Sequence, residues 1–164
     1  MDANSPEESR RQAQECFALA YQHQMKGELE EAITLYQRSL ELCPSAEAHT
    51  FLGWTYSFQK RYQEAIDECY KAIEVDPEFG NPYNDIGAYL IELDRWEEAI
   101  PWFHKALQAS RYESYFFPHF NMGRVYEHLK QWKQAEQCYR DALKVNPNYR
   151  LAQAALKRLS SRWN

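Results

Sequence analysis

The sequence predicts an all-α fold of about nine helices arranged as antiparallel hairpins. Apolar residues recur at the three- to four-residue spacing of a helix face, most clearly at Ala65, Ile66, Cys69, Ala72 and Ile73. The two-helix pattern of residues 46–77 repeats along the chain, and no segment alternates as a strand does. The five glycines and seven prolines are few for a protein of β-hairpins, and most fall between the expected helices.

The first four helices are bounded by start and stop signals. Ser5, Pro6 and Glu8 predict a helix start, with Ser as N-cap, Pro at the first position and Glu closing a capping box. Gly27 ends this helix. Pro44 and Pro77 end the second and fourth helices because proline cannot continue a helix. The expected helices cover about residues 5–26, 28–42, 46–60 and 62–75.

Five further helices are expected in the second half of the chain. Asn81 and Pro82 mark the start of the first of them, as cap and first position. Pro101 falls inside the next helix and is expected to kink it or to remove one of its hydrogen bonds. A longer connection lies around residues 110–118. The expected helices cover about residues 82–93, 95–109, 116–130, 132–145 and 149–162.

The hairpins share a common register. Equivalent alanines follow one another at spacings of 33, 34 and 36 residues, at Ala32, Ala65, Ala99 and Ala135. Four residues after each alanine stands a ring or a cysteine, at Tyr36, Cys69, Phe103 and Tyr139. Twelve residues before each stands a small residue, at Ala20, Gly53, Gly87 and Gly123. Small residues at these places allow two helices to approach closely.

This register resembles the tetratricopeptide-repeat family, whose pattern is W-x2-L-G-x2-Y, then A-x3-F, then P. The second repeat matches best, with Leu52, Gly53, Tyr56, Ala65, Ala72 and Pro77. The third repeat departs from the pattern, with Arg111 where proline is expected. The resemblance implies a right-handed α-solenoid whose concave groove is lined by the first helix of each pair.

The expected organisation is a polar lead, four repeats and a cap. The lead is residues 1–4. The repeat region is 5–147, with repeats at about 13–45, 46–79, 80–115 and 116–149, and residues 148–164 form a C-terminal capping helix. One helical hairpin cannot bury both its faces, so stacked hairpins share a core and the last element closes it.

A second apolar stripe runs along the first helices, on the side opposite the packing face. In the second repeat it consists of Phe51, Trp54 and Phe58. The resemblance places these positions in the groove, which then has an aromatic half and a polar half. The candidate peptide-binding residues are Phe17, Tyr21, Phe51, Trp54, Phe58, Asn84, Asp85, Phe117, Phe120, Asn121 and Arg124. Rings suit apolar side chains and amides suit a peptide backbone. Packing of these aromatics between neighbouring first helices is the alternative interpretation.

One known mode of the family is capture of an acidic chaperone tail by a clamp of Lys, Asn and Arg. The corresponding residues here are Phe17, Tyr21, Phe51, Asn81 and Asp85, or, one repeat later, Thr50, Trp54, Asp85, Phe117 and Asn121. Neither set contains a basic residue. The sequence therefore predicts a groove that is not of the carboxylate-clamp type.

Composition and charge exclude several classes of function. The net charge of −5 gives no general attraction to nucleic acid or anionic lipid, so neither a nucleic acid nor a membrane is an expected partner. The start of the chain lacks an apolar signal segment, and the four cysteines lack a C-x-x-C pair, so a cytoplasmic location with reduced thiols is expected. The C-terminal third is more basic than the rest, but carries no sustained basic stripe.

No assembled catalytic chemistry is predicted. The five histidines show no metal spacing, no nucleophile is placed beside a base, and no glycine-rich phosphate loop is present. We expect no catalytic residues, no metal and no cofactor. The predicted function is a non-enzymatic scaffold for protein–protein interaction that binds a peptide segment of an unidentified partner. The alternatives are a self-associating structural protein, such as a homodimer, and a small secretion or assembly chaperone.

Overall fold

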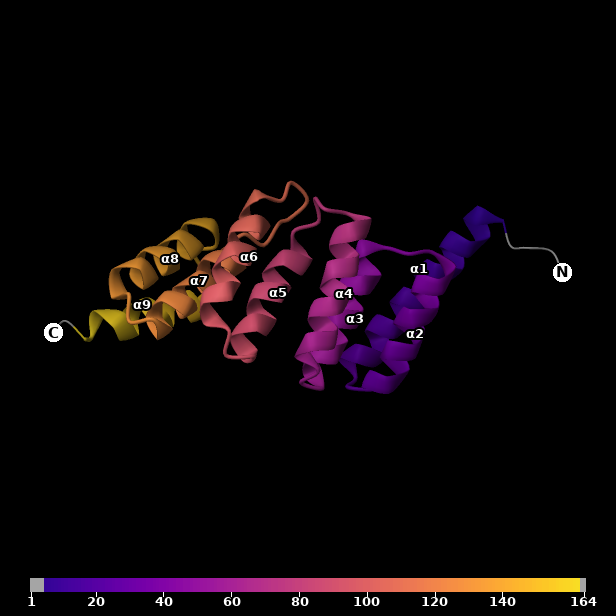
Figure 1. Ribbon diagram of the computed structural model, residues 1–164, viewed down its shortest axis with the longest axis horizontal. Helices are drawn as coiled ribbons and strands as arrows, with labels where there is room; N and C mark the ends of the chain where they lie inside the picture. The colour runs from indigo at the N-terminus through magenta and orange to yellow at the C-terminus, as the bar shows by residue number, and fades with distance from the viewer. Residues whose placement is uncertain (1–4, 163–164) are drawn as a thin grey trace. The chain divides into compact units, whose positions relative to one another are not determined.

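A computed structural model describes residues 5–162 of the chain (Figure 1). These residues form nine helices and no β-strand, which confirms the predicted all-α fold. The predicted boundaries agree with the observed ones to within two residues. The helices are α1 Pro6–Met25, α2 Leu29–Leu42, α3 Ala46–Phe58, α4 Tyr62–Val75, α5 Asn81–Glu92, α6 Trp96–Gln108, α7 Phe116–His128, α8 Trp132–Val145 and α9 Arg150–Ser160.

The chain divides into two compact units, Met1–Pro82 and Tyr83–Asn164. The first unit contains α1 to α4, where α1 packs on α2, α2 on α3, and α3 on α4. The second unit contains nearly all of α5 and the helices α6 to α9, where α6 packs on α7, α7 on α8, and α8 on α9. We propose that consecutive helix pairs correspond to the four predicted repeats and that α9 is the capping helix.

The turns between paired helices have the same backbone geometry in every hairpin. One residue in each turn adopts a left-handed conformation, with φ of 80°, 59°, 60° and 59° at Gly27, Lys60, Asp94 and Lys130. The next residue donates its N–H to the carbonyl five positions earlier, at 2.8–3.0 Å. This bond is the C-terminal helix closure known as the Schellman motif. Only Gly27 is a glycine, so the other three turns accept a cost of about 1 kcal/mol each.

The side chains at the predicted register form the core of each unit. Ala32, Ala65, Ala99 and Ala135 have no exposed surface, and neither do the residues four positions later. The glycines opposite Phe103 and Tyr139 leave no space for a side chain. A Cβ atom added at Gly87 would lie 2.5 Å from Cε1 of Phe103, far inside van der Waals contact. The paired helices therefore approach as closely as the register predicts.

Two serine side chains cap helix starts, at Ser5, as predicted, and at Ser45. The hydroxyl of Ser5 accepts from the backbone N–H of Glu8 at 3.2 Å, and the hydroxyl of Ser45 accepts from Ala48 N–H at 3.1 Å. Each satisfies a backbone donor that a helix start leaves without a partner. Helix α6 runs through Pro101, which is exposed and cannot donate the bond that a helix interior otherwise makes.

We expect Gly123→Ala to lower the free energy of unfolding by about 1–3 kcal/mol, since the added methyl group collides with the buried ring of Tyr139. Helix propensity alone would make the same substitution stabilising by about 1 kcal/mol. Urea unfolding of the single variants and of Gly123→Ala/Tyr139→Leu measures the contact. In the double variant the smaller leucine should recover part of the stability that Gly123→Ala loses. The effects of the two substitutions on the free energy of unfolding should therefore not add. The close approach of the two helices would be contradicted if Gly123→Ala were stabilising, or if the effects of the two substitutions simply added.

Candidate functional site

The first candidate site is an aromatic surface on α1 and α3 of the first unit. The structure brings together the five side chains predicted for the aromatic half of the groove. Successive rings have centroids 5.2–5.8 Å apart, mostly edge to face, which is a favourable arrangement for aromatic pairs. We call this set the aromatic surface: Phe17, Tyr21, Phe51, Trp54 and Phe58.

The members of the aromatic surface differ in exposure. Phe51 lies at its centre and contacts four other rings, one of which is the buried Tyr36. Phe17 also contacts Tyr36, so both phenylalanines contribute to packing between α1, α2 and α3. Tyr21 and Phe58 remain 41% and 54% exposed. The inner rings thus pack as the alternative interpretation expected, while the outer rings leave apolar area open to a ligand.

A polar row crosses α5 and α7 in the second unit. Asn121 donates through Nδ2 to Oδ1 of Asn84 at 3.2 Å, and both side chains are buried. Arg124 donates to Oδ1 of Asn121 at 3.3 Å. The predicted polar residues therefore lie together, and their amides already bond one another. A peptide backbone would have to compete for these groups or use their remaining bonding capacity.

Asp85 adjoins this row at the start of α5. Burial raises the pKa of its carboxyl to about 7, although a bond from Asn84 at 3.4 Å acts in the opposite direction. A carboxyl with this pKa is partly protonated near neutral pH and can then donate a hydrogen bond. Its charge state is therefore sensitive to a partner placed beside it.

Phe117 and Phe120 belong to a separate ring cluster in the second unit. Both pack against Tyr149, with centroids 5.8 and 5.2 Å apart, and Phe120 also contacts the buried Tyr139. Phe117 is 38% exposed. These rings fix the connection before α9 against α7, so packing accounts for most of their contacts.

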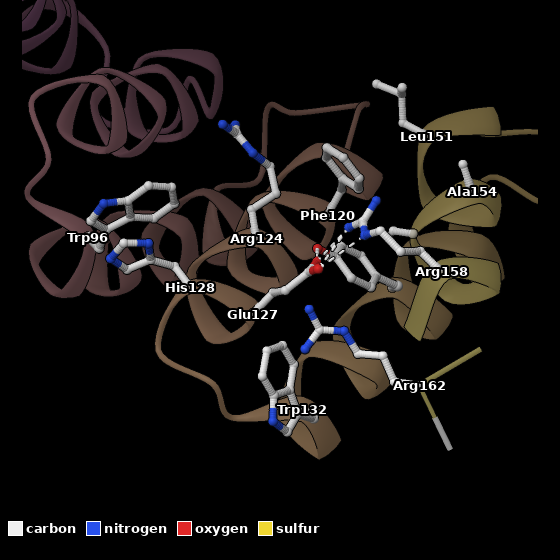
Figure 2. Close-up of a pocket in the computed structure, with 12 residues that line it drawn as sticks. Trp96, Phe120, Arg124, Glu127, His128, Trp132, Leu151, Ala154, Arg158 and Arg162 are labelled. Atoms are coloured by element: carbon white, nitrogen blue, oxygen red, sulfur yellow. Dashed lines mark hydrogen bonds and ion pairs between the residues drawn. The ribbon is translucent and has the colours of Figure 1, made fainter. Parts of the chain in front are cut away.

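The second candidate site is a cleft of about 500 Å³ in the second unit, between α7 and α9 (Figure 2). Trp96 of α6 and Trp132 of α8 contribute to its wall. We call it the arginine cleft. It is lined by Trp96, Phe120, Arg124, Glu127, His128, Trp132, Tyr139, Leu151, Ala154, Ala155, Arg158 and Arg162.

Glu127 is the hydrogen-bonded centre of the arginine cleft. Its carboxylate accepts three bonds from Arg158, at 2.7, 2.9 and 3.2 Å (Figure 2). It also accepts one from the hydroxyl of Tyr139 at 2.7 Å. Desolvation opposes ionisation, but the bonds from Arg158 and Tyr139 outweigh it and lower the pKa of Glu127 below its usual value. Glu127 thereby ties together helices α7, α8 and α9.

A stacked ring pair and a cation–π contact line the cleft. The rings of Trp96 and His128 are stacked, with centroids 4.0 Å apart and planes inclined by 6°. The guanidinium of Arg162 lies 4.3 Å from the ring centroid of Trp132, a cation–π arrangement. Both contacts hold polar nitrogen atoms beside apolar ring faces, so the cleft offers charge and apolar area together.

Sequence reasoning placed Phe120 and Arg124 at a site but missed Trp96, Glu127, Arg158 and Arg162. The repeat register covers only equivalent positions of the first helices, and Arg158 and Arg162 follow the last repeat. The available signal was the basic side of the last helix, where Arg158 and Arg162 are four residues apart and so share a helix face.

Residues 5–162 contain no group of three or more His, Cys, Asp or Glu side chains arranged to hold a metal ion. Within the same residues, no helix is both long enough and apolar enough to cross a bilayer.

Comparison with known families gives a match over most of the chain. The family described as tetratricopeptide repeat matches residues 9–78 and 78–148. The type IV pilus assembly protein PilF of Pseudomonas aeruginosa is 29% identical over 124 residues. That alignment covers 75% of this chain and 49% of the relative, so the chain spans about half the length of this curated relative.

Solved structures share the fold. The structure of Pseudomonas aeruginosa PilF has a TM-score of 0.87 at 24% identity, covering 94% of this chain and 70% of its own. PilW, described as a type IV pilus biogenesis factor, has a TM-score of 0.83 at 21% identity, with coverages of 91% and 69%. YrrB, described as having an unusual peptide-binding site, has a TM-score of 0.66 at 23% identity, with coverages of 90% and 75%.

We expect Glu127→Gln to lower the free energy of unfolding at neutral pH by about 1–2 kcal/mol, because charge-assisted bonds become weaker neutral ones. The folded-state pKa of Glu127 lies below its unfolded value. The stabilisation is therefore complete above the unfolded pKa of about 4.3 and is lost as the pH falls through the folded pKa. Urea unfolding at neutral and acidic pH measures the difference.

The matched control for this substitution is Glu136→Gln. Its partner Arg140 lies on the same helix, and both side chains are more exposed, so the expected loss is about 0.5 kcal/mol or less. The expectation is wrong if Glu127→Gln loses no more stability than the control, or if its deficit persists in acid.

Proposed function

The chain belongs to the tetratricopeptide-repeat family, and we propose that it is a non-enzymatic module that holds a peptide segment of a partner protein. The family is one of protein-interaction scaffolds. The observation that carries the proposal is the aromatic surface on α1 and α3. Its outer rings, Tyr21 and Phe58, are fixed at one side by packing and open at the other.

Several features support a peptide as the ligand of the aromatic surface. Five rings within contact distance offer more apolar area than scattered surface residues normally do, and clusters of this kind often bind partners. The inner rings are held by edge-to-face contacts, so the outer rings lose little freedom when a ligand binds. Peptide binding is also described for one structure of the same fold.

The type of ligand we propose has apolar or aromatic side chains. The residues equivalent to a carboxylate clamp include no basic side chain: they are Phe17, Tyr21, Phe51, Asn81 and Asp85. In addition, residues 1–82 carry 15 acidic and 7 basic side chains, a net charge of −8. An acidic tail would be repelled from this half of the chain, whereas an apolar segment with basic flanks would be attracted.

Selection of displayed peptides against the wild-type chain tests the proposal. We expect enrichment of sequences with two or more large apolar side chains. Tyr21→Ala/Phe58→Ala should weaken binding of the selected peptides by about tenfold or more while far-UV helicity is retained, since both rings are largely exposed.

The matched control is Leu19→Ala/Val75→Ala. It also removes two apolar side chains of the first unit, 47% and 45% exposed, but outside the aromatic surface. Binding by the control should stay within about twofold of wild type. Equal losses in the two double variants, or no enrichment by the wild type, would remove the proposal.

A second candidate is an assembly role, which is favoured by the similarity to a pilus assembly protein. A chain that holds one partner segment could deliver or align subunits of a larger structure. Expression in Pseudomonas aeruginosa lacking PilF tests it, with surface pili counted by electron microscopy. Restored pili would support a shared role, and the Tyr21→Ala/Phe58→Ala variant should then restore fewer. Absence of pili with the chain folded and abundant would remove this candidate.

A further inference from the structure

The arginine cleft carries more positive charge than its own contacts use. Three arginines and one carboxylate line it, so its formal charge is +2 with histidine neutral. Arg158 is paired with the carboxylate of Glu127, to which its Nη2 and Nε donate three bonds. Arg124 and Arg162 therefore carry the remaining positive charge of the cleft.

Arg124 is held only loosely. Its bond to Asn121 is 3.3 Å long, and its nearest carboxylate, on Glu92, is 3.9 Å away. Both distances are much longer than the 2.7 Å ion pair between Arg158 and Glu127. The Arg124 side chain is 36% exposed, so its guanidinium is accessible from the cleft.

Arg162 follows the last turn of α9 and lies over the Trp132 ring. No carboxylate of the described residues lies within ion-pair distance of it, whereas Arg158, four residues earlier, has Glu127. Figure 2 shows Arg124 and Arg162 on either side of the Glu127–Arg158 pair. Two accessible guanidinium groups therefore flank a central pair that is already neutral.

The cleft also offers apolar contact beside this charge. Leu151 is 57% exposed on α9, and Ala154 lies on the same helix; both line the cleft. The stacked Trp96 and His128 rings face it from the side of α7 (Figure 2). A suitable ligand therefore combines carboxylate groups with apolar side chains.

The charge of the second unit agrees with this requirement. Residues 83–164 carry 9 acidic and 12 basic side chains, a net charge of +3, whereas residues 1–82 have a net charge of −8. The strongly negative first half of the chain disfavours a long polyanion such as nucleic acid, which would bring charge to both halves. A short acidic peptide segment can instead place its negative charge on the positively charged second unit alone.

We propose that the arginine cleft binds an acidic segment of a partner protein, with Arg124 and Arg162 pairing its Asp or Glu side chains and Leu151 contacting an apolar neighbour. This inference deepens the proposed function, on which it rests, by naming the chemistry of a second partner segment. The residues involved are not those of the carboxylate clamp, and a free C-terminal carboxylate is not required.

Fluorescence polarisation with a defined probe tests the proposal on the full chain. The probe is a labelled peptide of Glu and Leu residues, capped at both ends, and its control has Gln in place of Glu. We expect the acidic probe to bind about tenfold or more tightly than the Gln probe, and to weaken as salt rises above about 150 mM. Equal binding of the two probes would overturn the proposal.

The informative variant is Arg124→Gln/Arg162→Gln, and its control is Arg140→Gln/Lys144→Gln. The control removes the same charge from exposed positions of α8 outside the cleft. We expect about tenfold weaker binding by the cleft variant and a change within about twofold by the control. Circular dichroism checks folding, and Arg162→Gln alone serves if the double variant is unfolded. Equal losses in cleft and control variants would overturn the proposal.

Other occupants and the peptide-binding function itself are distinguished in the same experiment. Competition by a single-stranded oligonucleotide as effective as the unlabelled acidic peptide would overturn the peptide assignment. Self-association in sedimentation that is lost in Arg124→Gln/Arg162→Gln would assign the cleft to a second copy and also overturn it. If the acidic probe fails while selected apolar peptides still depend on Tyr21 and Phe58, the inference falls and the proposed function stands.

Discussion

The close approach of the two helices in each hairpin is the constraint on which the rest of this structure depends. The first hairpin has Ala20 at the close contact, and the other three have a glycine there: Gly53 faces the carbonyl of Ala65, Gly87 the ring of Phe103, and Gly123 the ring of Tyr139. No side chain fits between them, so each first helix is held by one fixed face. That arrangement commits one side of the helix to packing and leaves the opposite side to carry other residues. The outer rings of the aromatic surface, Tyr21 and Phe58, lie on such a side, and it is for this exposed part of the helices that we propose a binding role.

The fold was largely predictable because its determinants are local and repeated. The spacing of 33, 34 and 36 residues appears in the alanines and again in the left-handed turn residues Gly27, Lys60, Asp94 and Lys130. A register that fixes both the close contact and the turn leaves few other arrangements for the helices. The turns themselves were harder to predict, because lysine and aspartate occupy three positions where glycine would signal this conformation. The bonds that close the helix ends hold these residues in place despite the cost.

The candidate sites were less predictable because they depend on contacts between residues far apart in the sequence. Asn84 and Asn121 bond each other across 37 positions, and Glu127 and Arg158 pair across 31. Helical periodicity could place Phe51 on the face away from its partner helix, but not reveal that Phe17, Tyr21 and Tyr36 surround it. The same limit hid the arginine cleft. Trp96, Glu127 and Arg158 come from three different helices, and no pattern within one helix connects them.

The capping helix shows how stability and binding can be separated in one element. Closing a helical repeat requires α9 to bury an apolar face and to present a polar one. Ala155 and Leu159 supply the buried face, and the Arg158–Glu127 pair fixes the helix against α7. Arg162 lies beyond the last turn, where its backbone N–H bonds the carbonyl of Leu159 and its guanidinium lies over the Trp132 ring and favours the ionised form of Glu127 from a distance. A second arginine with no acidic partner is not explained by docking of α9, and in a chain whose net charge is −5 it is not explained by solubility either. Its position beside the neutralised Glu127 makes the charge of the cleft depend on Arg124 and Arg162, which are the two groups that folding leaves available to a ligand.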